Sequence, residues 1–417
     1  MSKLKSIDLF AGCGGLSLGL EQAGFETVFV NELHPDAMNT FLVNRPKSIL
    51  SNPKNHVWDI KSLTKTKESL QTFGKYISEE HGEIDLVCGG PPCQGYSGIG
   101  HRRTFDLEKR EIPTNHLYKD MAKVISTVAP KMFLFENVRG LLNAKWTAEG
   151  EKGEIWRDVQ KTFRNLSVKV GKKEFKYQIG FKLVFAKDYG VPQNRPRILM
   201  VGLREDFNFS FTNQDTSRGL LPEGLGEAPD LKDLFSDLID PKWRERKETT
   251  AYLKDPVTEI QESLRTLPNG NVMMKGAKLT EQEYSNHSDA VITKFLYMIQ
   301  HDSEIPESMR TKKFSQKVLP KVWGKNGPSI TATSLPDDYV HFSQPRILTV
   351  REWARLQMFP DWYTFAGKRT TGGRRRAGDP DAGDWTREVP KYTQIGNAVP
   401  VKLAKEVGLH FKKILGC

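Results

Sequence analysis

Short apolar runs alternate with amphipathic stretches along the first half of the chain. The runs have the length of buried strands, and the amphipathic stretches have the spacing of helices that bury one face. Strands are predicted at residues 6–10, 27–30, 84–87, 132–135 and 198–201, and helices at 16–23, 35–43 and 116–128. This alternation is typical of an α/β fold, in which a mostly parallel sheet carries helices on both faces.

The regular alternation stops after the last of these strands. Residues 207–345 are rich in charge, glycine and proline and have no regular succession of strands and helices. Helical patterns return at 348–359 and at 399–415. The sequence therefore predicts two domains. These are an α/β domain of residues 1–206, completed by 392–417, and a smaller, irregular domain of residues 207–391.

Positive charge exceeds negative charge, with 62 lysine and arginine residues against 51 aspartate and glutamate residues and a formal net charge of +11. The resulting pI near 9.2 favours a polyanionic partner such as nucleic acid. The four cysteines have neither paired metal-ligand spacing nor the pattern of a disulfide framework, so we expect no metal site. Neither a signal-peptide stretch nor an apolar run of membrane-spanning length is present. We therefore expect a cytoplasmic protein without a membrane partner.

Two candidate reactive groups follow predicted strands. Cys93 belongs to Pro91-Pro92-Cys93-Gln94, directly after the buried run 84–90, where prolines stiffen the backbone at the end of a strand. Glu136 directly follows the strand at 132–135. Because open α/β sheets bind ligands at the carboxyl ends of their strands, both groups can face one substrate. Taken singly, Cys93 also fits a buried structural thiol, and Glu136 fits an ordinary ion-paired acid.

Basic residues gather in two further segments. Gln193-Asn194-Arg195-Pro196-Arg197 places two arginines two residues apart, which in an extended chain directs both side chains to one face. Residues 368–376 form a glycine-rich basic stretch that is able to follow phosphates. Each segment also fits a solvated part of the surface.

A glycine turn lies between the first predicted strand and the first predicted helix, in Phe10-Ala11-Gly12-Cys13-Gly14-Gly15. Glycines let a ligand approach the backbone closely. The dinucleotide fingerprint G-x-G-x-x-G is absent because Ser17 occupies its third glycine position, so the turn suits a nucleoside with an amino-acid tail. Glu32 ends the second strand, where it can bind a ribose, and Asp59 is placed to end a third, where it can receive an amino group. This order favours S-adenosylmethionine over NAD.

Six segments, taken in order, carry a family resemblance. They are residues 10–15, 91–94, 136–138 and 193–197, Arg351-Glu352-Trp353-Ala354-Arg355-Leu356-Gln357, and Gln394-Ile395-Gly396-Asn397-Ala398-Val399-Pro400. Together they resemble the ordered motifs of the cytosine-5 DNA methyltransferases of bacterial restriction-modification systems, with a variable region at about 207–320. The resemblance implies a Rossmann-like, S-adenosylmethionine-dependent methyltransferase domain, which is the catalytic domain, and a smaller, irregular target-recognition domain.

The resemblance implies methyl transfer to C5 of a specific cytosine in double-stranded DNA. Cys93 would add to C6 and make C5 nucleophilic toward the methyl sulfonium. Glu136 would bind and protonate N3, while Arg195 and Arg197 would hold O2 and neighbouring phosphate or carboxylate groups. The target nucleotide would be flipped out, because C5 is inaccessible in a stacked duplex.

Residues 94–110 resemble the family's mobile catalytic loop. Ile99 would fill the space that the flipped base leaves. Phosphate contacts are expected from the basic residues of the loop, which are Arg102, Arg103, Lys109 and Arg110.

The resemblance also implies cofactor contacts. Phe10 would lie against the adenine, Glu32 would bind the ribose, and Asp59 would bind the adenine amino group. The remaining contacts are expected from Gly12, Gly14 and Gly15 near the methionine moiety and from Ile60, Pro91, Leu117 and Asn397. Leu33 departs from the family pattern, because many relatives have an aromatic residue there, so the adenine pocket is expected to pack differently.

We expect double-stranded DNA as the partner, a monomeric enzyme, and a cognate restriction endonuclease that forms no stable complex with it. An alternative substrate is tRNA, although the second predicted domain lacks the tripeptide Cys-Phe-Thr. A catalytically silent DNA-binding protein is disfavoured because Cys93, Glu136, Arg195 and Arg197 are all present. An NAD-linked enzyme is disfavoured by the position of Ser17. The target sequence is not predicted.

Overall fold

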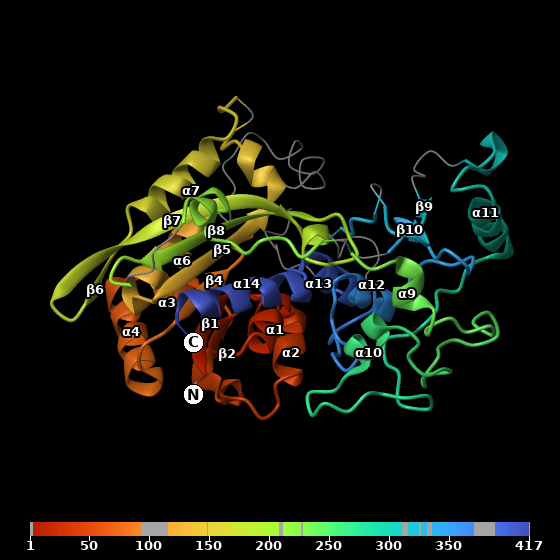
Figure 1. The fold of residues 1–417 in the computed structure, drawn as a ribbon, viewed down its shortest axis with the longest axis horizontal. Helices are drawn as coiled ribbons and strands as arrows, with labels where there is room; N and C mark the ends of the chain where they lie inside the picture. Colours follow the sequence, from red (N-terminus) through yellow and green to blue (C-terminus); the bar gives the residue numbers. More distant parts are fainter. Residues whose placement is uncertain are drawn as a thin grey trace, which may run out of the picture.

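An eight-stranded sheet forms the centre of the structure (Figure 1). The computed structural model describes the chain except for residues 1–2, 93–115, 148, 208–211, 227, 311–315, 325–326, 332–335, 371–387 and 417. The strand order is β3-β2-β1-β4-β5-β8-β7-β6. The first five strands in this order are parallel, namely β1 (Leu4–Leu9), β2 (Phe25–Asn31), β3 (His56–Val57), β4 (Leu86–Gly89) and β5 (Met132–Val138). The predicted parallel half of the sheet is therefore confirmed.

The other side of the sheet is antiparallel, which the sequence pattern did not predict. It consists of β6 (Ser167–Val170), β7 (Lys173–Phe185) and β8 (Pro196–Arg204). The predicted strand at 198–201 lies within β8, but β8 runs antiparallel to both β5 and β7. No helix long enough for a parallel crossover lies between β7 and β8, so the chain returns as a hairpin.

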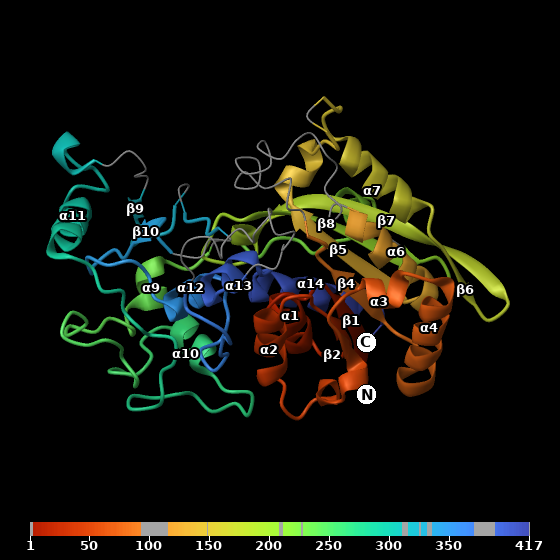
Figure 2. The ribbon, with the colours of Figure 1, turned by 180° about the vertical axis from the view of Figure 1, so that it is seen from behind.

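Helices cover both faces of the sheet, as the alternation predicted. On one face α4 (Lys67–His81), α6 (Leu117–Val128) and α7 (Glu154–Arg164) share a buried apolar cluster with the strands. On the other face α1 (Gly15–Gln22) and α14 (Val401–Ile414) lie side by side, as both ribbon views show (Figure 2). A Cβ atom at Gly19 of α1 would lie 2.3 Å from the carbonyl oxygen of Val401. This glycine therefore lets the last helix pack directly on the first.

Residues 207–391, which we call the second region, contain short elements joined by long irregular segments. Their helices are α8 (Asn213–Ser217), α9 (Leu231–Phe235), α10 (Glu259–Arg265), α11 (Asp289–Gln300) and α12 (Val350–Leu356), and α13 (Lys391–Asn397) begins at the last residue of the region. Two two-residue strands, β9 (Lys317–Val318) and β10 (Tyr339–Val340), pair parallel. The largest apolar cluster of the molecule joins this region to α1 and α14. None of the described helices is long and apolar enough to cross a membrane.

Buried ion pairs surround α12 in the second region. Arg355 contacts Asp237 at 2.6 Å and Asp361 at 2.5 Å, and all three side chains have no exposed surface. A second pair joins Arg346 to Glu352 at 2.6 Å, also without exposed surface. The helix predicted at 348–359 is present but shorter, as α12 (Val350–Leu356), and its charged residues lie in the interior. They hold α12 against α9, where the backbone carbonyl of Leu234 also accepts a hydrogen bond from Arg355.

Candidate active site

The turn after β1 has an unusual backbone. Phe10, Gly12 and Gly14 have φ angles of 58°, 57° and 84°. Phe10 was predicted as the last residue of the first strand, but it lies after β1, in a left-handed conformation that a non-glycine residue adopts at a cost. Its backbone N–H donates to Oδ1 of Asn31, which fixes the turn to the end of β2. Strain of this kind is common at ligand sites.

Glu32 lies beside this turn with both carboxylate oxygens fixed. The backbone N–H of Gly12 donates to Oε2 at 2.8 Å, and the backbone N–H of His34 donates to Oε1 at 2.8 Å. The side chain is buried at the carboxyl end of β2. Each carboxylate oxygen keeps a further lone pair, so Glu32 can still accept hydrogen bonds from a diol.

The three glycines proposed to contact the cofactor differ in what surrounds them. A Cβ atom at Gly12 would meet nothing within 4 Å, so the backbone there is open to a ligand. At Gly14 it would lie 2.8 Å from the ring of Phe41, and at Gly15 it would lie 2.4 Å from the carbonyl oxygen of Val399. Gly14 and Gly15 therefore permit close packing of protein on protein, and Gly12 leaves space for a ligand.

Asn31 organises this edge of the sheet, and the sequence reasoning missed it. Its Nδ2 donates to the carbonyl oxygens of Val57 and Trp58 at 3.1 and 2.8 Å, and its Oδ1 accepts from Phe10. One buried amide thus ties together the ends of β1, β2 and β3. The available signal was a polar residue at the end of an apolar strand, directly before Glu32.

The remaining predicted cofactor residues approach this edge from several elements. Asp59 follows β3 and is exposed, and its Oδ1 accepts the backbone N–H of Lys61 at 2.9 Å. Ile60 is buried in the apolar cluster on one face of the sheet, and Phe10 and Leu117 pack against the same cluster. Asn397, at the end of α13, is exposed.

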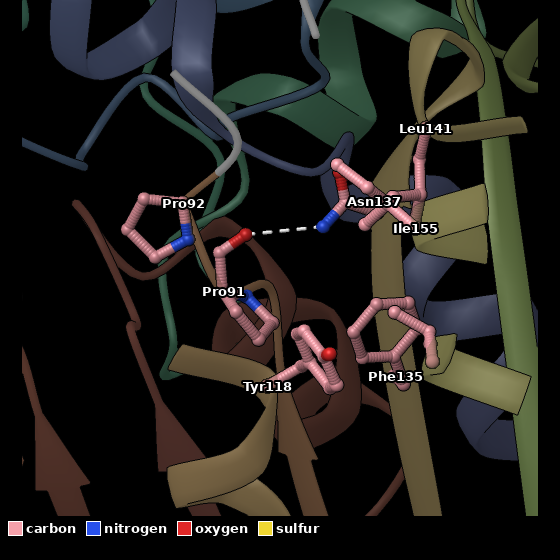
Figure 3. Close-up of a pocket in the computed structure, with 8 residues that line it drawn as sticks. Pro91, Pro92, Tyr118, Phe135, Asn137, Leu141 and Ile155 are labelled. Carbon is pink, nitrogen blue, oxygen red and sulfur yellow. Dashed lines mark hydrogen bonds between the residues drawn. The ribbon is translucent and has the colours of Figure 1, made fainter. Parts of the chain in front are cut away.

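Pro91 and Asn137 connect the ends of two neighbouring strands. Nδ2 of Asn137 in β5 donates to the carbonyl oxygen of Pro91 at 3.1 Å (Figure 3). A small apolar pocket adjoins this contact. Its lining residues are Pro91, Pro92, Tyr118, Phe135, Asn137, Leu141, Ile155 and Val159. Cys93 and the loop at 94–110 lie outside the described residues, as does most of the basic stretch 368–376.

Glu136 and Arg197 meet at the carboxyl end of β5. Oε1 of Glu136 lies 2.6 Å from Nε of Arg197, and the two side chains are 11% and 8% exposed. The antiparallel register places Val138 opposite Arg197, so Glu136 and Arg197 are diagonal neighbours on adjacent strands. A Cβ atom at Gly90 would lie 2.6 Å from Oε2 of Glu136, so only a glycine leaves room for the carboxylate here.

Arg195 is buried, but its guanidinium has different partners from that of Arg197. Nη1 donates to the carbonyl oxygen of Ile330 at 2.7 Å, and Nη2 donates to those of Gly396 and Ala398. Burial, together with the neighbouring Arg197, lowers the pKa of Arg195 well below its usual value. The two arginines predicted to act together are therefore both near the site, with only Arg197 paired to Glu136.

Buried polar atoms without a hydrogen-bond partner are concentrated in residues 193–197. Within the described part of the chain they include Oε1 of Gln193, Oδ1 of Asn194, Nε of Arg195 and Nε of Arg197. Although Nε of Arg197 lies close to Glu136, that contact is an ion pair without hydrogen-bond geometry. Native proteins satisfy most buried polar groups, so this run has bonding capacity for ordered water or for a polar ligand.

Comparison with known proteins gives consistent matches along the chain. A family model described as C-5 cytosine-specific DNA methylase matches residues 4–413. Type II methyltransferase M.DdeI from Desulfomicrobium norvegicum is 30% identical over 411 residues, covering 96% of this chain and 86% of the relative. Type II methyltransferase M.XorII from Xanthomonas oryzae pv. oryzae is 30% identical and covers 100% of this chain and 86% of its own length.

Two solved structures of methyltransferases are similar to this chain over nearly its whole length. One, described as a DNA modification methyltransferase encoded within a prophage of Escherichia coli, has a TM-score of 0.67 and 25% identity, with 99% of this chain and 100% of that chain covered. The Entamoeba histolytica methyltransferase EhMeth has a TM-score of 0.54 at 13% identity and covers 100% of this chain and 99% of its own, which is a likeness of fold.

Proposed function

The chain belongs to the C-5 cytosine-specific DNA methylase family, and from that premise we propose how its residues bind cofactor and methylate cytosine. The predicted family, enzyme class and Rossmann-like methyltransferase fold are confirmed. The protein is a cytosine-5 DNA methyltransferase of the type II restriction-modification class. The residue roles, the cofactor and the stable partners below are our proposals.

S-adenosylmethionine is the proposed cofactor, and the turn after β1 supports this choice. The carboxylate of Glu32 is fixed where it can bind the ribose hydroxyls. Phe10, Ile60 and Leu117, which belong to or pack against one apolar cluster, would contact the adenine, and the exposed Asp59 would bind its amino group. Gly12 leaves room beside the backbone for the methionine moiety, and Asn397 and Pro91 close the site. When bound, the cofactor supplies an electrophilic methyl group on sulfur.

Cys93 is the proposed nucleophile. Its thiolate adds to C6 of the cytosine while Glu136 delivers a proton to N3, which leaves an enamine with electron density at C5. C5 would then take the methyl group, whose bond to the cofactor's sulfur would break with S-adenosylhomocysteine as the leaving group. A bound water removes the C5 proton, the C6–S bond breaks with return of the thiolate, and N3 returns its proton to Glu136. No net change occurs in the enzyme.

The Glu136–Arg197 pair at the end of β5 carries this proposal. Arg197 keeps Glu136 in place, and both lie beside residues whose polar atoms lack partners. A cytosine edge offers N3 and O2 as acceptors and N4 as a donor, so it can bond to both Glu136 and Arg197 at this place. The base enters by flipping, since its ring is otherwise stacked.

We propose that the second region selects the DNA sequence and that the enzyme acts as a monomer, alongside a restriction endonuclease with which it forms no stable complex. Incubation with labelled S-adenosylmethionine and either duplex DNA or tRNA tests the substrate, with label expected in DNA. Bisulfite sequencing of host DNA after expression then identifies the methylated cytosine. Label in tRNA alone would contradict the proposal.

A further inference from the structure

Arg195 is a buried cation that lacks an acidic partner. The residue is 4% exposed, and no carboxylate of the described residues lies within 4 Å of its guanidinium. Its hydrogen bonds go to three backbone carbonyls instead. A buried charge is expensive unless it is paired, so a guanidinium held by carbonyls alone is unusual.

Arg204, on the same strand, shows the ordinary arrangement. It lies at the opposite end of β8, is 2% exposed, and contacts Glu83 at 2.9 Å and Asp206 at 2.7 Å. Its Nη1 also donates to the carbonyl oxygen of Ala129. Arg204 therefore serves the packing of the strand, and it provides a matched reference for Arg195.

The carbonyls that bind Arg195 come from two functionally different segments. Ile330 belongs to the second region, and the neighbouring Pro328 accepts the backbone N–H of Asn194 at 2.7 Å. Gly396 and Ala398 flank Asn397, the residue proposed to close the cofactor site. Arg195 is thus hydrogen-bonded to both the DNA side and the cofactor side of the molecule, two residues from Arg197.

A second set of hydrogen bonds holds the segment 395–398, which contains Asn397. Nε2 of Gln357 donates to the carbonyl oxygens of Ile395 and Ala398 at 2.8 and 3.0 Å, and Gln193 donates to Oε1 of Gln357 at 2.7 Å. These amides fix the 395–398 segment to α12 and β8. Of the three side chains that hold this segment, Arg195 is the one that also donates a hydrogen bond to Ile330.

We propose that Arg195 is a positioning residue that couples the binding of DNA at the second region to the binding of cofactor beside Asn397. The inference rests on the proposed function of both regions. The guanidinium is planar and rigid, so its donors keep a fixed relation to one another. A displacement of the Ile330 carbonyl when DNA binds must therefore be matched at Gly396 and Ala398, or a buried donor loses its partner.

The test is the ratio of DNA dissociation constants without and with saturating S-adenosylhomocysteine, measured by fluorescence anisotropy at one fixed salt concentration. The duplex carries the sequence context found by bisulfite sequencing. Typical couplings between two sites range from about 5-fold to about 150-fold, and we expect the wild type to lie in this range. Arg195→Lys keeps a nitrogen donor on a long side chain but cannot span both segments, so its ratio should fall below about 2-fold. Arg204→Lys should keep the wild-type ratio even if its thermal midpoint falls.

An unchanged ratio in Arg195→Lys, or the absence of coupling in the wild type, would overturn the inference. A wild type that binds neither ligand nor methylates DNA would instead contradict the proposed function. Hydrogen exchange of the wild type provides a test without a variant, in case Arg195→Lys does not fold. S-adenosylhomocysteine should slow exchange of the amides at 329–331, and unchanged exchange there would also overturn the inference.

Discussion

Two buried glutamate–arginine pairs have the same separation and different surroundings. Glu136 and Arg197 lie where the carboxyl end of β5 meets β8, and Glu352 and Arg346 lie within the second region, both pairs at 2.6 Å. The first pair has one contact and keeps some exposed surface. The second has none exposed, and both oxygens of Glu352 accept hydrogen bonds from Arg346.

The difference concerns unused bonding capacity. Burial alone would raise the pKa of Glu352, but Arg346 lowers it to about 2, and the backbone N–H of Thr349 binds the same carboxylate. Such a carboxylate has no capacity left for a substrate. Within the described residues, by contrast, the carboxylate oxygens of Glu136 accept no hydrogen bond, and their contact with Arg197 is an ion pair without hydrogen-bond geometry. Residue type and distance do not distinguish a site from a structural pair, but the remaining donors and acceptors do.

Glu136→Gln should have the largest effect, which is a loss of methylation activity. The amide keeps the shape of the side chain but cannot deliver a proton to N3, so kcat should fall by roughly 10²- to 10⁴-fold. The dissociation constant for S-adenosylhomocysteine should stay within about 3-fold of the wild-type value, because Glu136 has no proposed hydrogen bond to the cofactor. Loss of such a bond would weaken binding by more than that. Glu352→Gln is the matched control. A similar loss of kcat per folded molecule in both variants would contradict the distinction.

Glu352→Gln should lower the stability of the folded protein. It leaves the guanidinium of Arg346 buried without a counter-ion, which costs about 3–5 kcal/mol in the free energy of unfolding. Denaturant titration at pH 7 measures this change, and methylation per folded molecule should be unchanged. A loss of less than about 1 kcal/mol would mean that the ion pair contributes little to the second region.

The buried carboxyl group of Asp8 should make the stability of the sheet region depend on pH. Burial raises the pKa of this carboxyl to about 7, although a hydrogen bond from Ser17 lowers it in part, and Oδ1 has no partner. The folded protein therefore keeps a proton that the unfolded chain releases near its ordinary value of 3.8, so this contribution to stability falls as pH rises toward 7. The pKa of Asp8 is also lowered by the charge of Arg45 and by a hydrogen bond with Cys88, and it is raised by the charge of Glu21.

Asp8→Asn should remove this dependence. Between pH 5.5 and 8, the wild type should lose roughly 2 kcal/mol more stability than the variant, at about 1.4 kcal/mol per pH unit below the folded pKa. Parallel urea titrations at the two pH values measure the difference. Equal losses in the two proteins would show that Asp8 does not hold the proton.

Asp59→Asn should produce the smallest effect. Asp59 is exposed, so losing one charge-assisted hydrogen bond to the cofactor's amino group should weaken S-adenosylhomocysteine binding by about 5- to 10-fold. Calorimetric titration measures the affinity, and DNA binding without cofactor should not change. Unaltered affinity would exclude Asp59 from the cofactor site.

The same comparison explains which parts of the molecule were predictable. The helix at 35–43 was predicted with its observed bounds, because Pro35 marks its start. The parallel strands were predictable because their apolar runs are buried on both faces. The β6–β7 hairpin was missed, because lysines interrupt its apolar positions and many of its residues are exposed or half-buried.

Interior contacts between distant segments were the least predictable feature. Arg351 and Arg355 resemble surface residues of an amphipathic helix, and nothing in the local pattern indicates that Asp237 and Asp361 cover them. Arg195 and Arg197 were identified as a pair by spacing, but their partners at Ile330 and Glu136 depend on the fold. Spacing predicts which residues matter, and packing decides what each one contacts.

Trapping on a duplex that contains 5-fluorocytosine at the target position tests the central claim most directly. Fluorine cannot leave C5 as a proton does, so the adduct between C6 and the enzyme should persist after methyl transfer. The wild type should give a complex that survives denaturation, with the DNA attached to the peptide that contains Cys93, and Cys93→Ser should give none. Attachment at another residue, or methylation of ordinary DNA by Cys93→Ser at the wild-type rate, would contradict the account.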